Sequence, residues 1–322
     1  AANMIDAQTL QVGKLVAFME YLFHAMFSVM LFCMVFMLYP RASISAKRIM
    51  AVLNTETSIE NHPGNAQTDS GSGEHSVIFE HVDFVYPDGE EAVLKDISFS
   101  AKSGETVAFI GSTGSGKSSL IQLIPRFYDR ASGNIYIDGQ KIEDLDINAL
   151  RSKIGFVPQK AHLFSGTIEE NIRFGKPDAT MDEIIHAAKI AQAYDFIMEK
   201  PHQFQEQIVE GATNVSGGQK QRLSIARALI RKPEIYIYDD SFSALDFKTD
   251  ARLRKALKPE IKNAIVFLVA QRVSTILDAD KIVVLDEGKI AGIGTHRELL
   301  ASCPIYYEIA ASQLSKEELT YA

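Results

Sequence analysis

The stretch Gly111–Ser119 constrains this chain more than any other part of its sequence. It reads GSTGSGKSS and fits the pattern G-x-x-x-x-G-K-[ST], whose glycines let backbone N–H groups turn onto phosphate oxygens. The apolar run Thr106–Ile110 predicts a buried strand before it, and Lys117–Ile124 predicts a helix after it. This order of strand, loop and helix predicts a nucleotide-binding cradle, for which a flexible glycine and serine linker is the alternative.

The side chains of this loop predict how phosphates are held. We expect Lys117 to reach the β and γ phosphates, the Ser118 hydroxyl to be available to Mg²⁺, and the positive end of the helix dipole to face the anion. The predicted phosphate-binding residues are Gly111, Ser112, Thr113, Gly114, Ser115, Gly116, Lys117, Ser118 and Ser119.

Composition narrows the class of protein. A chain of 322 residues with 46% hydrophobic content can bury a full domain core, and its length allows one to three domains. The formal net charge is −8 and there is no Lys/Arg-rich block, so we expect no nucleic acid among its partners. Cys33 and Cys303 lie far apart in dissimilar surroundings, which predicts no disulfide and suits a reducing compartment for the soluble part.

An apolar segment lies near the N-terminus. Tyr21–Tyr39 is nearly free of polar residues and approaches the ~20 apolar residues that span a bilayer as a helix. We therefore predict a transmembrane helix over about residues 15–39, with a buried globular helix as the alternative. Three basic residues follow it, namely Arg41, Lys47 and Arg48. By the positive-inside rule its C-terminal end faces the cytoplasm, and the missing basic n-region and cleavage site predict no signal peptide.

A polar linker and a soluble domain are expected after this segment. Residues 42–53 are expected to continue helically, and Asn54–Ser76 is rich in small and polar residues. Strands are predicted over Val77–Tyr86, Ala92–Ser100, Thr106–Ile110, Asn134–Asp138, Ile235–Tyr238, Ala264–Val269 and Lys281–Leu285, and helices over Met181–Lys200 and Gln219–Arg231. Strands alternating with helices around a phosphate loop predict an α/β fold, with a mostly parallel sheet and the early strands as an antiparallel annex.

Two further motifs make the phosphate loop much more specific. Asn214–Arg222 reads NVSGGQKQR before a predicted helix, and Ile235–Asp240 reads IYIYDD, an apolar strand ending in two carboxylates. With these motifs the chain resembles the ATP-binding cassette transporters, and among them the exporters that fuse membrane and nucleotide-binding domains in one polypeptide. Phe164–Ile172, which reads FSGTIEENI, and Gly294–His296, which reads GTH, carry the same resemblance.

The resemblance implies a domain plan. Residues 77–315 would form a P-loop (RecA-like) nucleotide-binding domain with a helical subdomain, followed by a tail over 316–322. Residues 55–76 would be the linker. Residues 1–54 would be the C-terminal remnant of a transmembrane domain, containing its last helix at about 15–39 and the cytoplasmic extension of that helix.

The resemblance also implies roles for individual residues, with ATP as the nucleotide and Mg²⁺ as its metal. Tyr86 would stack on adenine, Gln159 would contact Mg²⁺ and the attacking water, and Asp239 would hold Mg²⁺ together with Ser118. A signature loop is implied at Ser216, Gly217, Gly218 and Gln219. This loop would act in trans by covering the γ-phosphate of ATP on a partner subunit, so that the catalytic unit is a dimer.

Two positions depart from the family pattern. Asp240 stands where the family places the Glu that polarises the attacking water, and a carboxylate drawn back by roughly 1 Å can cost about 10²-fold in rate. Gln271 stands where the family places His; it can donate a hydrogen bond but cannot carry a positive charge. With Gln159 these are the predicted catalytic residues, and the two departures predict a site that holds ATP and cleaves it slowly.

The sequence thus predicts one subunit of a heterodimeric exporter in the cell membrane, with its nucleotide-binding domain in the cytoplasm. Its partner would be a second, different half-transporter, and the pair would move an unidentified small molecule or peptide. The alternatives are a homodimeric exporter with slow turnover, a soluble ATPase of DNA repair or translation, and a regulatory ATP-binding module. The apolar N-terminal segment and Phe164–Ile172 favour the exporter.

Overall fold

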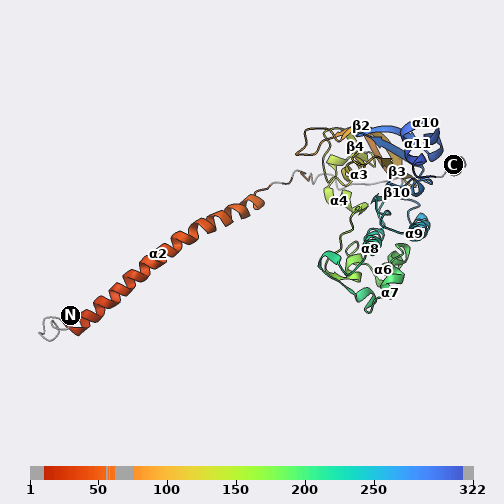
Figure 1. Ribbon diagram of the computed structural model, residues 1–322. Helices are drawn as coiled ribbons and strands as arrows, with labels where there is room; N and C mark the ends of the chain where they lie inside the picture. The colour runs from red at the N-terminus through yellow and green to blue at the C-terminus, as the bar shows by residue number, and fades with distance from the viewer. Residues whose placement is uncertain (1–10, 56, 58, 62–74, 315–322) are drawn as a thin grey trace. The chain divides into compact units, whose positions relative to one another are not determined.

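The computed structural model describes residues 11–55, 57, 59–61 and 75–314. The chain divides into two compact units, residues 1–60 and 61–322. The described part of the first unit is dominated by one helix, α2 (Val12–Leu53), which is 42 residues long and contains Pro40 (Figure 1). None of its residues is buried, and its mean hydropathy reaches 2.1 over an 18-residue window. By length and composition α2 can cross a membrane, and it continues through residues 42–53 as expected.

The second unit is built on a central sheet of six strands in the order β12-β11-β3-β10-β9-β6. The strands are β3 (Thr106–Gly111), β6 (Ile154–Val157), β9 (Ile235–Asp239), β10 (Ile265–Val269), β11 (Lys281–Asp286) and β12 (Lys289–Gly294). All neighbours are parallel except β12, which pairs antiparallel with β11 at the edge. Every residue of β9 and β10 is buried, which explains why β10 reads as an unbroken apolar run and β9 is apolar up to Asp239.

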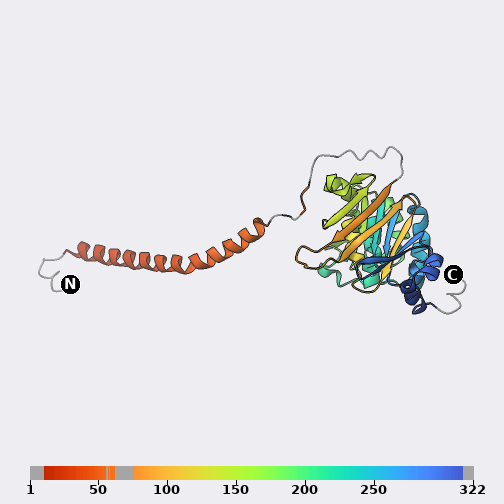
Figure 2. The same ribbon diagram turned by 90° about the horizontal axis from the view of Figure 1, so that it is seen from above.

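A second sheet is antiparallel and packs against the first. Its order is β2-β1-β4-β5, from β1 (Ser76–Phe84), β2 (Leu94–Lys102), β4 (Ser132–Ile137) and β5 (Gln140–Lys141), and Figure 2 shows its orange and yellow strands from above. Aromatic rings fill the space between the sheets: Phe99 lies 5.4 Å from Phe109 and 6.3 Å from Phe267, measured between ring centroids. This apolar layer packs the antiparallel sheet against β3, and so it holds in place the loop that follows β3.

Helices cover the central sheet and form a lobe of their own. The helices next to the sheets are α3 (Lys117–Leu123), α4 (Ile147–Ser152), α9 (Phe247–Glu260), α10 (His296–Ser302) and α11 (Pro304–Ala311). The lobe contains α5 (Ile168–Arg173), α6 (Met181–Ile190), α7 (Tyr194–Met198) and α8 (Gly217–Leu229), with a short ribbon of β7 (Gly166–Thr167) and β8 (Gln207–Ile208). In Figure 1 the labels α6, α7 and α8 lie together in this lobe. The α/β class, the mostly parallel sheet and the antiparallel annex are confirmed.

Several element boundaries differ from the sequence prediction. The helix predicted over Met181–Lys200 is divided into α6 and α7, because Gln192 adopts a left-handed φ of 55° that no continuous helix accommodates. The helix predicted from Gln219 begins earlier, at Gly217, where Ser216 caps it. Strands β6 and β12 were not predicted: β6 has only four residues, and β12 reads KIAGIG, with no buried residue and no apolar run to mark it.

Candidate functional site

The loop between β3 and α3 needs glycine at two positions for different reasons. Gly111 has a φ of +153°, and a Cβ there would collide with the backbone carbonyl of Leu285 on the adjacent strand. Gly116 has a φ of +95°, and a Cβ there would come within 2.6 Å of Leu94 Cδ2. Glycine at positions 111 and 116 therefore lets the loop adopt these backbone angles and lie close to β11 and β2.

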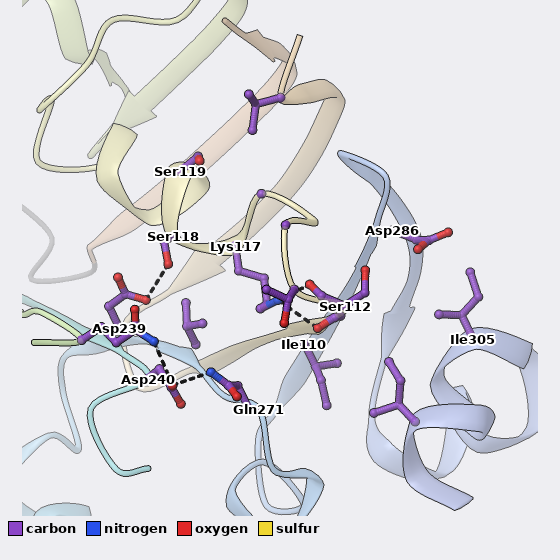
Figure 3. A pocket seen from close by; sticks show the side chains of 18 of the residues that line it. Ile110, Ser112, Lys117, Ser118, Ser119, Asp239, Asp240, Gln271, Asp286 and Ile305 are labelled. Carbon is purple, nitrogen blue, oxygen red and sulfur yellow. Dashed lines mark hydrogen bonds between the residues drawn. The ribbon is translucent and has the colours of Figure 1, made fainter. Parts of the chain in front are cut away.

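Lys117 points back over this loop (Figure 3). Its Nζ donates hydrogen bonds to the carbonyl oxygens of Gly111 at 2.9 Å and Ser112 at 2.6 Å, and to Ser115 Oγ at 3.3 Å. Burial lowers the pKa of Lys117, while the nearby carboxylates of Asp240 and Asp239 oppose that shift. The loop thus presents one fixed cation among its backbone groups, as an anionic phosphate ligand requires.

Asp239 and Ser118 come together from neighbouring elements. Asp239 is buried at the end of β9, and Ser118 Oγ on α3 donates to its Oδ1 at 2.9 Å (Figure 3). Burial raises the pKa of Asp239, the Ser118 hydrogen bond opposes this, and the neighbouring charge of Asp240 adds to it. A buried carboxylate beside a hydroxyl, with excess negative charge nearby, is an oxygen donor set that fits Mg²⁺.

The three predicted catalytic residues are in contact, because Gln271 and Gln159 both hydrogen-bond to Asp240. Gln271 Nε2 donates to its Oδ2 at 2.7 Å (Figure 3). Gln159 Nε2 donates to the same oxygen at 3.3 Å. Burial raises the pKa of Asp240, and these two hydrogen bonds work in the opposite direction. Asp240 also has a left-handed φ of 45°, a conformation that Asp tolerates better than most residues.

These groups open into one cavity of about 890 Å³, large enough for a nucleotide. Of the predicted residues, Gly111, Ser112, Thr113, Gly114, Gly116, Lys117, Ser118, Ser119, Gln159, Asp239, Asp240 and Gln271 line it. A second part of the wall was not predicted; it is formed by Val93, Asp286, Ile305, Glu308, Ile309, Ser312 and Gln313. No sequence motif marked these residues: Val93 directly precedes β2, Asp286 ends β11, and the other five reach the cavity through the packing of α11 and the turn after it.

Tyr86 lies beside the cavity but is not part of its wall within the described chain. Its hydroxyl hydrogen-bonds with Ser119 Oγ at 2.8 Å, and its ring packs edge-on against Phe84 and Tyr128 at centroid distances of 4.8 and 5.1 Å. The structure thus ties Tyr86 to the phosphate loop through Ser119. Stacking on a base stays a prediction.

The predicted signature loop lies elsewhere, at the start of α8. Ser216 caps the helix: its N–H donates to Gln219 Oε1 at 2.9 Å, and its Oγ accepts from the Gln219 N–H at 3.3 Å. Ser216 and Gly217 are exposed. None of Ser216, Gly217, Gly218 and Gln219 lines the cavity of this chain, as far as its described residues go.

A phosphate loop between a buried strand and a helix, facing a carboxylate at the end of a nearby parallel strand, defines a P-loop nucleotide-binding domain. Residues 94–243 match the ABC transporter family. The chain therefore contains an ATP-binding domain of the ABC transporter family.

Known relatives agree with this assignment. An uncharacterized ABC transporter ATP-binding protein of Mycobacterium tuberculosis is 43% identical over 312 residues, which is 96% of this chain and 53% of the relative. The ABC transporter ATP-binding protein YfiB of Bacillus subtilis, also uncharacterized, is 44% identical over 313 residues, 97% of this chain and 54% of the relative. A bacterial Atm1-family ABC exporter solved with ATP bound has a TM-score of 0.82 and 33% identity, over 95% of this chain and 53% of its own. The chain spans about half the length of these relatives.

Proposed function

We propose that this chain is the ATP-binding subunit of an exporter, in which ATP binding and hydrolysis at a dimer interface drive a substrate across a membrane. Membership of the ABC family implies ATP hydrolase activity. Export is supported by the Atm1-family structure and by a Staphylococcus aureus relative, 48% identical over 237 residues (74% of this chain, 41% of the relative), whose name points to multidrug export. The observation that carries the proposal is the meeting of Lys117, Ser118 and Asp239 at one cavity.

Each of these residues has a distinct task in the proposed site. Lys117 compensates the charge of the outer phosphates, and the N–H groups of the phosphate loop receive their oxygens. Ser118 and Asp239 hold Mg²⁺, which neutralises charge on the phosphates when bound. Gln159 orients the attacking water, and Asp240 accepts its proton.

We further propose that this site is degenerate and cleaves ATP slowly. Asp240 is one methylene shorter than the Glu of the family pattern, and one of its oxygens already accepts two amide hydrogen bonds, from Gln271 and Gln159. Burial raises the pKa of Asp240, but the oxygen that accepts both amide hydrogen bonds is less accessible to the attacking water. Gln271 adds no positive charge for the transition state.

The exposed start of α8 supports a role in trans. Ser216 and Gly217 are exposed and do not line the cavity of their own chain. The Ser216 N–H is bonded to Gln219 Oε1, but its hydroxyl can still donate to a group on a second subunit. We infer that the partner is a different half-transporter that carries Glu and His where this chain has Asp240 and Gln271. Identification of the chain that copurifies with the full-length protein tests this, and a partner with the same Asp and Gln would contradict it.

For the N-terminal unit we propose that α2 is the last membrane helix of the transporter, that residues 55–76 link it to a cytoplasmic domain over 77–315, and that 316–322 form a tail. The tail lies outside the described residues, as do Glu56, Ser58 and residues 62–74 of the linker. Carbonate extraction of membranes should leave the chain in the pellet until detergent is added. Release without detergent would favour a soluble ATPase.

ATP binding by the full chain tests the proposed site directly. Lys117→Ala removes the cation that lies over the phosphate loop and should weaken Mg-ATP binding about tenfold or more, whereas Lys289→Ala, an exposed lysine on β12, should leave it unchanged. Equal ATP affinity in wild type and Lys117→Ala would exclude this cavity as the nucleotide site.

A further inference from the structure

One side chain near the C-terminal end of the described chain holds the backbone that carries Gln271. Gln313 Nε2 donates to the Gln271 carbonyl at 2.9 Å, and the Val273 N–H donates to Gln313 Oε1 at 2.8 Å. A single amide therefore satisfies a carbonyl and an N–H two residues apart, as a neighbouring strand would. The segment it clamps comes directly after β10 ends at Val269.

The helix that precedes Gln313 is anchored in the core. Gln313 lies just beyond α11, and its N–H donates to the Ala310 carbonyl at 3.0 Å. Ala310 and Tyr306 are fully buried, and the Tyr306 hydroxyl hydrogen-bonds with His296 Nδ1 at 2.7 Å. The amide of Gln313 thus extends from a helix that is anchored in the core.

The segment held by Gln313, residues 271–273, is buried at one end and exposed at the other. Val273 is fully buried, whereas Gln271 is exposed and reaches across to Asp240 Oδ2 at 2.7 Å. An exposed glutamine has several rotatable bonds, so holding its backbone reduces the number of conformations from which the side-chain amide must select the one that reaches Asp240. A shift of about 1 Å of the side-chain amide itself would take it out of hydrogen-bonding range of Asp240.

We propose that Gln313 is a positioning residue for ATP hydrolysis: it fixes the backbone of residues 271–273 so that the Gln271 amide stays aimed at Asp240 in the nucleotide cavity. Gln313 lines the cavity, but both polar atoms of its amide bond to the backbone of Val273 and Gln271, so we assign its effect to Gln271. Helix α11 lies beyond the family-matched residues 94–243, and through Gln313 it would help to position a catalytic residue. The inference rests on the proposed ATPase function.

The test compares single-turnover cleavage of Mg-ATP by the full chain and its variants. Gln313→Ala removes both hydrogen bonds and should slow cleavage about tenfold or more, with ATP affinity unchanged, because misplacement on the ångström scale acts on the chemical step. Gln313→Glu keeps the acceptor for Val273 but sets a carboxylate oxygen against the Gln271 carbonyl, which repels it, so it should slow cleavage at least as much as Gln313→Ala. Tyr307→Ala is the control, since Tyr307 is exposed on the same helix, does not line the cavity and should not alter the rate.

Two further readouts separate positioning from a general loss of structure. Hydrogen exchange of the Val273 amide should accelerate in Gln313→Ala, while exchange in α11 stays as in wild type. In a Gln271→Ala background, Gln313→Ala should cause no additional loss of rate, because the residue through which it acts is already gone.

Several outcomes would overturn the inference: an unchanged rate in Gln313→Ala, an equal loss in Tyr307→Ala, or additive losses in the Gln271→Ala background. These outcomes differ from failure of the proposed function. If the wild-type chain binds no ATP, the function itself is wrong. If it binds and cleaves ATP and Gln313→Ala behaves identically, only the role of Gln313 is wrong.

Discussion

Gln271 Nε2 donates a hydrogen bond to Asp240 Oδ2 at 2.7 Å, so the two residues that depart from the family pattern contact each other directly. Gln159 donates to the same oxygen at 3.3 Å. The departures are therefore in direct contact, at the place where we propose that the attacking water loses its proton. A short carboxylate held by neutral amides replaces the longer carboxylate and the ionisable imidazole that the family pattern places there.

This contact predicts that hydrolysis can be restored by exchanging both residues together. Asp240→Glu advances the carboxylate by about 1 Å, and Gln271→His supplies a ring that can be charged, so the double variant should cleave ATP about 10²-fold faster than wild type. Each single variant should gain less, because the pair is coupled. Steady-state ATPase of the purified full chain is the measurement. A double variant no faster than wild type would mean that the slow step lies elsewhere.

The contacts of Tyr86 predict two different results at one position. Tyr86→Ala removes the ring beside the phosphate loop and should weaken ATP and GTP binding alike, because aromatic stacking tolerates any base. Tyr86→Phe keeps the ring and loses only the hydrogen bond to Ser119, so nucleotide affinity should stay near wild type. Titration of both variants with each nucleotide measures this. A loss confined to ATP would point to recognition of the adenine edge.

A polar cluster distant in sequence from the nucleotide loop predicts a pH-dependent stability. Lys153 Nζ lies 2.7 Å from Asp138 Oδ2 and 3.0 Å from Glu234 Oε2, and His75 Nδ1 lies within 3.3 Å of both carboxylates. Burial alone would raise the pKa of Asp138, but hydrogen bonds from Lys153 and the Ser76 N–H outweigh it, and the pKa is lowered from 3.8. A lowered pKa means that the folded state favours the carboxylate, so this stabilisation is complete above about pH 4 and is lost as the pH falls further.

Asp138→Asn should therefore lower the free energy of unfolding by about 1.5–3 kcal/mol at pH 7, with a difference that narrows below pH 4. Chemical unfolding of the full chain at both pH values measures it. The matched control is Asp96→Asn, which weakens the solvent-exposed pair with His81 and should cause little change. An equal loss of unfolding free energy at pH 7 and below pH 4 would mean that packing, and not the charge of Asp138, is responsible.

The parts of the site that local pattern determines were predictable. A glycine loop after an apolar strand, and a carboxylate at the end of a second apolar strand, reveal themselves within a few residues, and parallel strands bring their ends to one edge. The Gln313 clamp was not predictable, because it joins residues 40 and 42 positions apart through the packing of α11. The hydrogen bond between Tyr86 and Ser119 was missed for the same reason. The left-handed turn at Gln192 had no glycine to mark it.

We propose that this chain holds ATP at a slow site and completes a fast site on its partner. Steady-state ATPase of the purified pair at saturating Mg-ATP, compared between two variants, tests it most directly. Ser216→Arg places bulk and charge where the partner-bound γ-phosphate should lie, whereas Asp240→Ala removes a base that contributes little. Thr180→Ala controls for the lost helix cap, because it removes the same kind of capping box from α6.

We expect Ser216→Arg to remove most of the ATPase activity of the pair, Asp240→Ala to reduce it only modestly, and Thr180→Ala to leave it unchanged. Activity abolished by Asp240→Ala and retained in Ser216→Arg would show that the hydrolytic site is the one on this chain, and would contradict the proposed asymmetry.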